Sequence, residues 1–415
     1  MALEPAACKR GPLRRTLMCK DAEALRFSYD PLRRAVVGRP EVLDERCLPP
    51  GTLGHGGRFG KGPLASWLTG RGVPLSRPGL SPVLSSLGLA GPEELQVAEL
   101  GLSLSDHYWF RPPDRDDVRW ESVNFFDRPF SPELGEALAP HGPDSGSAAL
   151  RRVEEGGLVV TSSPDAALDG SLPRRWRIAP GGTRLLVKSG KAASLFQGPF
   201  NEAVATALCR RILPQGAYVP YELRPNGCPA FLSACPCTVD KDRELVVAGD
   251  VVRSHKSDPS KSRHGNFAEI CEAHGVPDVR PGLARMLAVD HVVANFDRRW
   301  GNFGVIAETD ARRRVGLVPI YDAGESLWCD RALANDFRPY TKALYPMPFS
   351  ADISGQLGRY AENLGWLDPG ALDGFVDEAV DVLACNREVA AMPGRLEGIR
   401  AALERTVQDV LRARG

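Results

Sequence analysis

The sequence predicts an α+β protein in which a strand-rich lobe precedes a helical lobe, with a further strand-rich unit before both. Apolar and polar residues alternate in short runs at 14–50, strand-like runs return between 150 and 240, and apolar residues recur at helical spacing from 281 onward. A segment rich in proline, glycine and serine at 140–148 separates the first unit from the rest. The predicted organisation is a disordered N-terminus at 1–13, an N-terminal β-rich unit at 14–148, a small lobe at 149–240 and a large helical lobe at 241–415.

Length and composition are ordinary for a soluble globular protein. The chain has 415 residues, of which 25% are charged and 43% hydrophobic, and its formal net charge is zero. A neutral chain has no global field that would attract nucleic acid or an anionic membrane, so we predict neither partner. The ten cysteines form no C-x-x-C pair or zinc-ligand spacing. Because we find neither a signal-peptide core nor an apolar run of membrane-span length, we expect a cytoplasmic protein with reduced thiols.

The N-terminal unit is predicted to begin with short antiparallel strands within 14–50 and to continue with short helices. Ser131, followed by a proline and a glutamate, indicates a helix start at which the serine side chain caps the first turn. The aromatic segment at 101–110 is interpreted as an apolar strap packed on a neighbouring domain. The helices of this unit are expected at 63–70, 82–89, 92–100 and 131–137.

The small lobe is predicted to consist of three strands, a helix and two further strands, in that order. The basic, serine-rich segment at 250–266 that follows is interpreted first as a flexible surface loop, with a phosphorylated regulatory loop as the alternative. The large lobe should then be mainly helical, with one hairpin. The expected strands are 157–161, 174–178, 184–188, 218–223 and 230–234, with the helix at 201–213; the hairpin is expected at 303–320 and the last helix at 396–410.

Three side chains in the large lobe carry a chemical signal. Asp297 and Asn302 have four residues between them, which is the D-x-x-x-x-N spacing of a protein-kinase catalytic loop. Asp322 opens an Asp-Ala-Gly turn directly after an apolar run, where a kinase carries its second metal-binding aspartate. The hairpin between Asn302 and Asp322 would bring the two together. The alternative is that aspartate and asparagine occur here only as common turn residues.

Phosphoryl transfer explains why these residue types would be needed. One carboxylate orients the attacking hydroxyl and takes its proton, while hard oxygen ligands hold Mg²⁺ against the phosphates. In this interpretation Asp297 is the base, and Asn302 and Asp322 are the metal ligands. Lys188 ends an apolar strand and would contact the phosphates of ATP, with Glu202 in the following helix placed to pair with its ammonium group.

The loop that would cover the phosphates is the least typical part. It lacks G-x-G-x-x-G, and Gly170 is the single glycine between the first two strands of the small lobe. Backbone N–H groups of Ser162, Ser163 and Gly170, together with the serine hydroxyls, are the candidates for cradling phosphate.

The motifs together resemble one known family, the HipA-like serine/threonine kinases of bacterial toxin–antitoxin pairs. The resemblance rests on S-L-S-D-H-Y-W-F at 103–110, S-P-D-A-A-L-D-G-S-L-P-R-R-W-R-I at 163–178, L-L-V-K-S-G at 185–190, P-F-N-E at 199–202, A-N-F-D-R-R-W-G-N-F-G at 294–304 and P-I-Y-D-A-G-E-S-L at 319–327. It extends from about residue 14 nearly to the end of the chain.

The resemblance implies a two-lobed protein-kinase-like fold with an N-terminal β-rich subdomain. It also implies the use of ATP and Mg²⁺, transfer to a protein serine or threonine, and autophosphorylation of a serine in the phosphate loop, either Ser162 or Ser163. The implied partners are a protein substrate and an antitoxin-like protein. Arg299 stands where the family often has histidine. Two alternatives stay open: a kinase-like enzyme acting on a small molecule or lipid, and a catalytically silent nucleotide-binding module.

Overall fold

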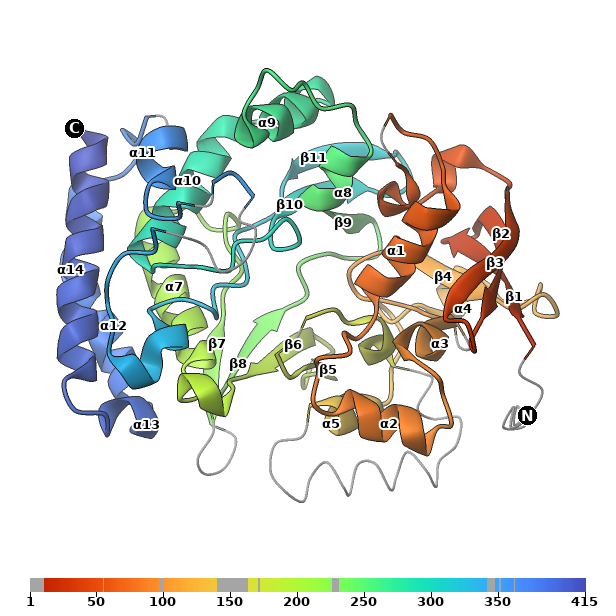
Figure 1. The fold of residues 1–415 in the computed structure, drawn as a ribbon, viewed down its shortest axis with the longest axis horizontal. Helices are drawn as coiled ribbons and strands as arrows, with labels where there is room; N and C mark the ends of the chain where they lie inside the picture. The colour runs from red at the N-terminus through yellow and green to blue at the C-terminus, as the bar shows by residue number, and fades with distance from the viewer. Residues whose placement is uncertain are drawn as a thin grey trace.

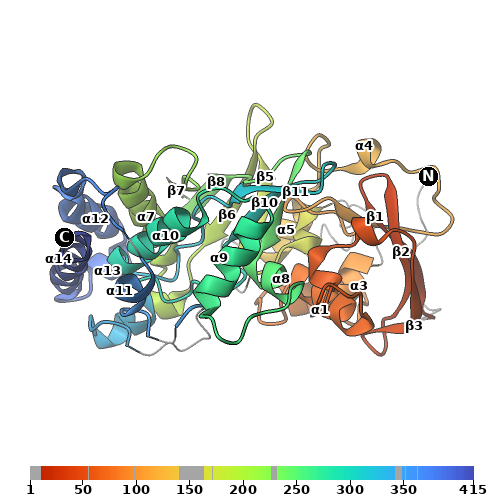
Figure 2. The ribbon, with the colours of Figure 1, turned by 90° about the horizontal axis from the view of Figure 1, so that it is seen from above.

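A computed structural model describes residues 11–54, 56–97, 100–139, 163–170, 172–225, 231–341, 348–350, 352–361 and 363–415. The described chain is elongated, with the N-terminal sheet at one end and the last helix, α14, at the other (Figures 1 and 2). Its described residues form three antiparallel sheets surrounded by helices, so the predicted α+β class is confirmed. The predicted linker at 140–148 and the predicted strand at 157–161 lie outside the described residues.

The N-terminal sheet has the strand order β3-β2-β1-β4. Its strands pair antiparallel. The helix α1 (Lys61–Arg71) packs Leu64 and Leu68 against the apolar side chains of this sheet. The segment at 101–110 ends in a strand of this sheet: Trp109 and Phe110 are fully buried, and Phe110 pairs with Leu17 of β1. Leu102, Leu104 and Trp109 also share a buried cluster with Trp176, which lies outside this unit, as the strap interpretation expects. The strands are β1 (Leu13–Cys19), β2 (Ala22–Asp30), β3 (Ala35–Val42) and β4 (Tyr108–Arg111).

Short helices complete this unit. The last of them begins two residues after the predicted cap: Pro132 is its N-cap residue and makes no side-chain hydrogen bond, while Ser131 accepts a hydrogen bond from the backbone N–H of Glu133 at 3.3 Å. The α-helices are α2 (Leu80–Ser86), α3 (Pro92–Val97), α4 (Trp120–Val123) and α5 (Glu133–Leu138), and two 3₁₀ turns lie at Glu45–Cys47 and Pro50–Thr52.

The second sheet, with the order β5-β6-β8-β7, is the strand-built part of the small lobe. The helix α7 (Gly198–Ile212) follows β6 and carries Glu202 in its first two turns. The strand predicted at 218–223 is displaced, because Tyr218 forms a parallel bridge with Ile320 and the ladder begins only at Glu222. The strands are β5 (Arg174–Ile178), β6 (Arg184–Ser189), β7 (Glu222–Pro225) and β8 (Phe231–Pro236), with 3₁₀ turns at Pro164–Ala167 and Ala192–Ser194.

The rest of the chain is mainly helical around a third sheet, of order β11-β10-β9. A core of buried apolar side chains joins α7, α10, α12 and α14, including Val204, Val289, Phe375 and Leu403. The third sheet consists of β9 (Arg243–Val247), β10 (Gly304–Glu308) and β11 (Arg313–Leu317). The helices are α8 (Ala248–Arg253), α9 (Arg263–Ala273), α10 (Val279–Val292), α11 (Gln356–Tyr360), α12 (Phe375–Ala384), α13 (Arg387–Ala390) and α14 (Arg395–Arg414), with 3₁₀ turns at Cys329–Ala334 and Pro369–Leu372.

Two features of this helical part bear on the sequence predictions. The hairpin expected before Asp322 is present as β10 and β11. The segment 250–266, interpreted as a flexible loop, contains the end of α8 and the start of α9, so the connection between these helices covers only 254–262. No helix among the described residues is both long enough and apolar enough to span a membrane.

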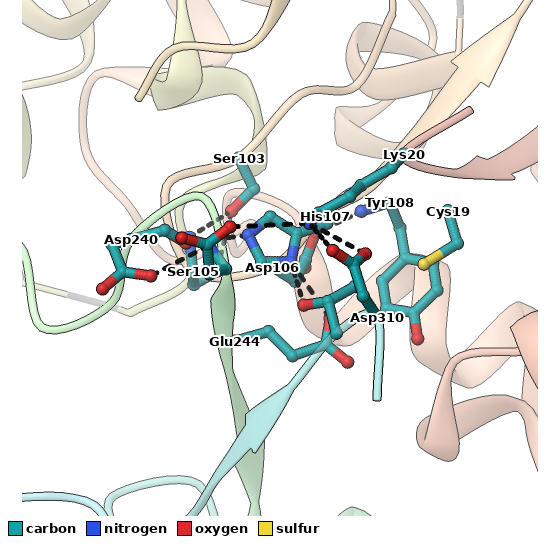
Figure 3. A network of polar contacts seen from close by, with 12 residues as sticks. Cys19, Lys20, Ser103, Ser105, Asp106, His107, Tyr108, Asp240, Glu244 and Asp310 are labelled. Atoms are coloured by element: carbon teal, nitrogen blue, oxygen red, sulfur yellow. Dashed lines mark hydrogen bonds and ion pairs between the residues drawn. The ribbon is translucent and has the colours of Figure 1, made fainter. Parts of the chain in front are cut away.

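The N-terminal unit is fastened to the third sheet by a buried polar network (Figure 3). His107 is fully buried: its Nδ1 contacts the Thr309 hydroxyl, and its Nε2 lies 2.8 Å from the carbonyl oxygen of Asp240. At the edge of the network, the ammonium of Lys20 is 2.9 Å from a carboxylate oxygen of Asp310. These contacts hold the turn between β10 and β11 against the N-terminal unit.

Candidate active site

One buried arginine organises the loop that carries Asp297. Arg298 is 1% exposed and forms a two-pronged ion pair with Asp290, at 2.9 Å from Nε and 2.8 Å from Nη2. Its Nη1 donates to the carbonyl oxygens of Asn302, at 2.6 Å, and Tyr321, at 2.5 Å. A buried charge must be paired and hydrogen-bonded to be tolerated. Arg298 therefore links three parts of the chain: helix α10, the loop from Asp297 to Asn302, and the residue before Asp322.

Asp297 lies in this loop with both its backbone and its carboxylate held. Its N–H donates to the side-chain oxygen of Asn295 at 3.0 Å, and its carbonyl oxygen accepts from the side-chain amide of Asn302 at 2.7 Å. Arg299 contacts both carboxylate oxygens, at 2.7 and 2.9 Å. Burial raises the pKa of Asp297 to about 6, and the charge of Asp322 adds to this, while Arg299 opposes it. A carboxylate with such a pKa is suited to accept a proton near neutral pH.

Lys188 is the centre of a buried charge cluster. Its ammonium nitrogen is 2.7 Å from Glu202, 2.6 Å from Asp322 and 3.1 Å from the hydroxyl of Tyr221. Burial alone would lower the pKa of Lys188, but the carboxylates of Asp322 and Glu202 outweigh it and hold that pKa above its ordinary value. The predicted lysine–glutamate pair is therefore present in the geometry, and the lysine contacts the aspartate of the Asp-Ala-Gly turn as well.

The turn after β11 aims Asp322 back toward this cluster. Its φ is 60°, a left-handed conformation that aspartate tolerates better than most residues. The next N–H, of Ala323, donates to the second carboxylate oxygen of Glu202 at 3.0 Å. Asn201 donates to the carbonyl oxygens of Gly324 and Ser326, at 2.8 and 2.9 Å. Helix α7 thus fixes the turn along its length.

Asp322 stays ionised in this setting. Burial would raise its pKa, but the ammonium of Lys188 and the guanidinium of Arg174 together hold the pKa well below its usual range. Ionised carboxylate oxygens and amide oxygens are the hard donors that Mg²⁺ prefers. The hydrogen bond that Asn302 donates through its amide nitrogen leaves its side-chain oxygen as the atom for a cation. The donors present therefore fit a magnesium ion held by Asn302 and Asp322.

Arg174 is a residue of this site that the sequence reasoning missed. It opens β5 opposite Lys188 in the ladder, and the charges of Asp322 and Asp169 raise its pKa above the ordinary value despite burial, which lowers it. Its buried Nε has no hydrogen-bond partner among the described residues. Its position in the sequence could have indicated this role, because Arg174 is a cationic residue at the start of the strand that pairs with the strand of Lys188.

The predicted phosphate loop is only partly described. Ser162 lies outside the described residues. Ser163 is buried, and its hydroxyl donates to the carboxylate of Asp165 at 2.8 Å within its own 3₁₀ turn. Gly170 has a φ of 108°, and a side-chain carbon there would lie 2.2 Å from the guanidinium carbon of Arg174. Gly170 thus permits the close approach of Arg174, while Ser163 is engaged within the turn.

The pH dependence of the site should follow Asp297. A reaction in which Asp297 is the base needs its carboxylate ionised, so we expect the rate of such a reaction to rise with pH through about 6, above the ordinary aspartate value. Arg299→Ala removes the charge that lowers this pKa, so the acidic limb of the rate profile should move to higher pH, and Arg299→Lys should move it less. Initial rates from about pH 5 to about pH 8 measure this. A limb that stays in place in Arg299→Ala would rule out Asp297 as the titrating group.

The Asp290–Arg298 pair should be needed for folding as well as for position. Asp290→Asn leaves the Arg298 guanidinium buried without its counter-charge, and removing one partner of a buried pair costs about 3–5 kcal/mol. We expect a large fall in the free energy of unfolding measured with urea. Asp377→Asn serves as the control, since the Asp377 side chain is exposed and pairs with Arg400 at the surface. Equal stability of the two variants would contradict the role given to Arg298.

Comparisons with known proteins give structural similarities but no family. No protein-family model matches the chain, and no curated protein matches it. Among solved structures, the chain is similar to a Helicobacter pylori proinflammatory kinase, CtkA, at 13% sequence identity and a TM-score of 0.42. The match covers 58% of this chain and 92% of that one. At this level of similarity, we base the functional proposal on the residues of the site.

Proposed function

We propose that this protein is an ATP- and Mg²⁺-dependent kinase that transfers the γ-phosphate of ATP to a serine or threonine hydroxyl of a protein. The observation that carries the proposal is the Lys188 ammonium within 3 Å of both Glu202 and Asp322. These groups come from a strand, a helix and a turn that are far apart in sequence. Asp322 is also close enough to raise the pKa of Asp297, so the predicted base, lysine and acid belong to one electrostatic site.

Each side chain has a defined task in this reaction. Asp297 orients the acceptor hydroxyl and takes its proton while the hydroxyl oxygen bonds to the γ-phosphorus and the bond to the leaving ADP oxygen breaks. Lys188 contacts the phosphates and is kept charged by Glu202. Asn302 and Asp322 would hold Mg²⁺, which neutralises charge on the phosphate oxygens when it is bound. Arg298 takes no part in the chemistry, but it positions the backbone on both sides of the metal ligands.

Arg174 adds a second cation on the phosphate side. An arginine fork is suited to phosphate oxygens, and among the residues that the structure describes the buried Nε–H of Arg174 has no partner. We expect Arg174→Ala to weaken ATP binding by about tenfold, with a smaller effect for Arg174→Lys, which keeps the charge but not the fork. Arg177→Ala is the control, since Arg177 lies on the same strand with an exposed side chain. Equilibrium binding of a fluorescent ATP analogue measures the change, and equal affinity in all variants would contradict this role.

The proposed function is tested by finding which molecule receives the γ-phosphate of ATP. The full-length purified chain is incubated with γ-labelled ATP and Mg²⁺, alone and with a cell extract, and compared with a reaction containing EDTA. We expect label on protein serine or threonine, dependent on Mg²⁺, on the chain itself or on an extract protein. Label only on a metabolite or lipid would replace the protein-kinase assignment with the small-molecule alternative. Nucleotide binding without any transfer would indicate the catalytically silent module.

Autophosphorylation is the part of the proposal that the geometry constrains most. Ser163 is buried and its hydroxyl is hydrogen-bonded to Asp165, whose other oxygen accepts the N–H of Trp176 at 2.9 Å. Modification of Ser163 would therefore require the turn at Pro164–Ala167 to open. Mapping the labelled residue by mass spectrometry distinguishes Ser163 from Ser162.

A further inference from the structure

Two histidines outside the proposed active site face each other at the surface. His255 follows helix α8 and His274 follows helix α9, and both hold their rings against the end of the helix that each follows. The ring planes are nearly perpendicular, at 86°, with centroids 4.7 Å apart. The two Nε2 atoms are 3.2 Å apart. His274 is exposed and His255 partly so, and solvent therefore reaches the pair.

The other ring nitrogens determine where the protons are. Nδ1 of His255 lies 2.7 Å from the carbonyl oxygen of Val251, and Nδ1 of His274 lies 2.7 Å from that of Ile270. A carbonyl oxygen only accepts, so each Nδ1 must carry the hydrogen. In the neutral rings both Nε2 atoms then present lone pairs to each other. Two nitrogen lone pairs at a distance of 3.2 Å repel each other unless a cation lies between them. The arrangement of the two Nε2 atoms therefore suits either one shared proton or one bound metal ion.

We propose that His255 and His274 bind a divalent transition-metal ion, Zn²⁺ or a close relative, through their Nε2 atoms. Imidazole nitrogens suit such ions, and a ligating histidine usually donates its other N–H to a backbone carbonyl, as both do here. With tetrahedral geometry and Zn–N bonds of about 2.05 Å, the two nitrogens of a site stand about 3.3 Å apart. The observed separation of 3.2 Å is close to that value.

The neighbouring charges disfavour a shared proton. Burial lowers the pKa of His255, and the nearby guanidinium of Arg314 lowers it further, which keeps that ring neutral at neutral pH. A metal ion forms coordinate bonds that offset this repulsion, whereas a proton gains only one hydrogen bond. The described residues contain no cluster of three or more histidine, cysteine, aspartate or glutamate side chains suited to a metal. The ion would therefore have two protein ligands, with water completing its coordination and exchange with solvent easy.

The position of the pair gives the ion a structural role. It would join the C-terminal ends of α8 and α9 across the connection at 254–262. Both helices support Trp300, three residues beyond Asp297: the N–H of Gly249 donates to the Trp300 carbonyl oxygen at 3.0 Å, and the ring of Phe267 lies 6.2 Å from that of Trp300. Metal binding should therefore stabilise the layer beneath the catalytic loop without touching the Mg²⁺ ligands.

Calorimetric titration with Zn²⁺, in excess Mg²⁺ so that the oxygen-ligand site is saturated, tests the proposal. We expect one Zn²⁺ per chain in the wild type, at least about tenfold weaker binding in His255→Gln and in His274→Gln, and a rise in melting temperature with Zn²⁺ that both variants lose. His291→Gln is the matched control, because that histidine pairs with Asp409 instead. Both substituted residues lie near the surface, and circular dichroism checks that the variants fold.

Two results would contradict zinc binding by this histidine pair. If the double variant His255→Gln/His274→Gln binds Zn²⁺ as the wild type does, the ion sits elsewhere. If the wild type binds no Zn²⁺ while the pair titrates as one group, a shared proton holds the rings together. The test does not depend on kinase activity, so its outcome is separate from that of the proposed function.

Discussion

Asp297→Asn is expected to reduce phosphoryl transfer by about 10²- to 10⁴-fold, the usual contribution of a general base. Asparagine keeps the shape of the side chain but cannot accept the hydroxyl proton. The backbone contacts that hold the residue, from Asn295 and Asn302, do not involve the carboxylate and should persist. Transfer rates with γ-labelled ATP measure the effect under conditions in which ATP is saturating.

Nucleotide binding separates this effect from a loss of structure. Asp297 does not contact Lys188, whose carboxylate partners are Glu202 and Asp322, so ATP affinity in Asp297→Asn should remain near that of the wild type. Asp381→Asn, at an exposed position on α12, is the control for loss of a carboxylate elsewhere. Transfer at the wild-type rate in Asp297→Asn would remove the general-base role.

Asp322→Asn is expected to abolish transfer and also to remove the dependence of ATP binding on Mg²⁺. The substitution deletes the proposed anionic metal ligand and one of the two carboxylates that hold the buried Lys188 ammonium. Asparagine tolerates the left-handed backbone at this position, so the turn should keep its shape. Binding of a fluorescent ATP analogue with and without Mg²⁺ measures the change.

The pH dependence of the free energy of unfolding gives an independent check on the charge state of Asp322. Because the pKa of this carboxylate is depressed in the folded protein, its stabilising contribution is present above the ordinary aspartate pKa and is lost as pH falls below it. Asp322→Asn should therefore reduce the loss of stability between neutral and acidic pH. A variant that keeps both Mg²⁺-dependent binding and the wild-type pH dependence of stability would contradict both roles of Asp322.

The parts of the site that are local in sequence could be predicted, and those that depend on long-range packing could not. The sequence predicts that Lys188, at the end of a strand, pairs with Glu202, at the start of the next helix, because this is the arrangement of the lysine–glutamate pair in kinases. The contact between Lys188 and Asp322 links residues 134 positions apart and depends on how the two lobes meet. An arginine in a polar loop, such as Arg298, looks exposed in sequence, although it is the most buried cation of the site.

The errors in the fold have similar causes. The mixed aromatic and polar residues of 101–110 predict a packed strap but not strand β4, which is buried on both faces and so shows no alternation to detect. The serines of 250–266 all lie in the connection at 254–262, and the interpretation as a loop extends too far at both ends, into α8 and α9. At 218–223, a strand-like pattern is satisfied by a bridge to Ile320.

The network around His107 has a practical consequence for anyone who shortens this chain. The turn held by Lys20 and His107 connects strands β10 and β11, and β10 starts two residues beyond Asn302. Glu244 of β9 is buried, with a carboxylate oxygen 3.9 Å from Nδ1 of His107. A truncated protein lacking the first 139 residues would therefore expose this carboxyl to water and leave the hairpin unanchored. Assays of such a fragment would report on a loosened form of the loop that carries Asn302, so the first third of the sequence belongs in every version used to test the proposed catalysis.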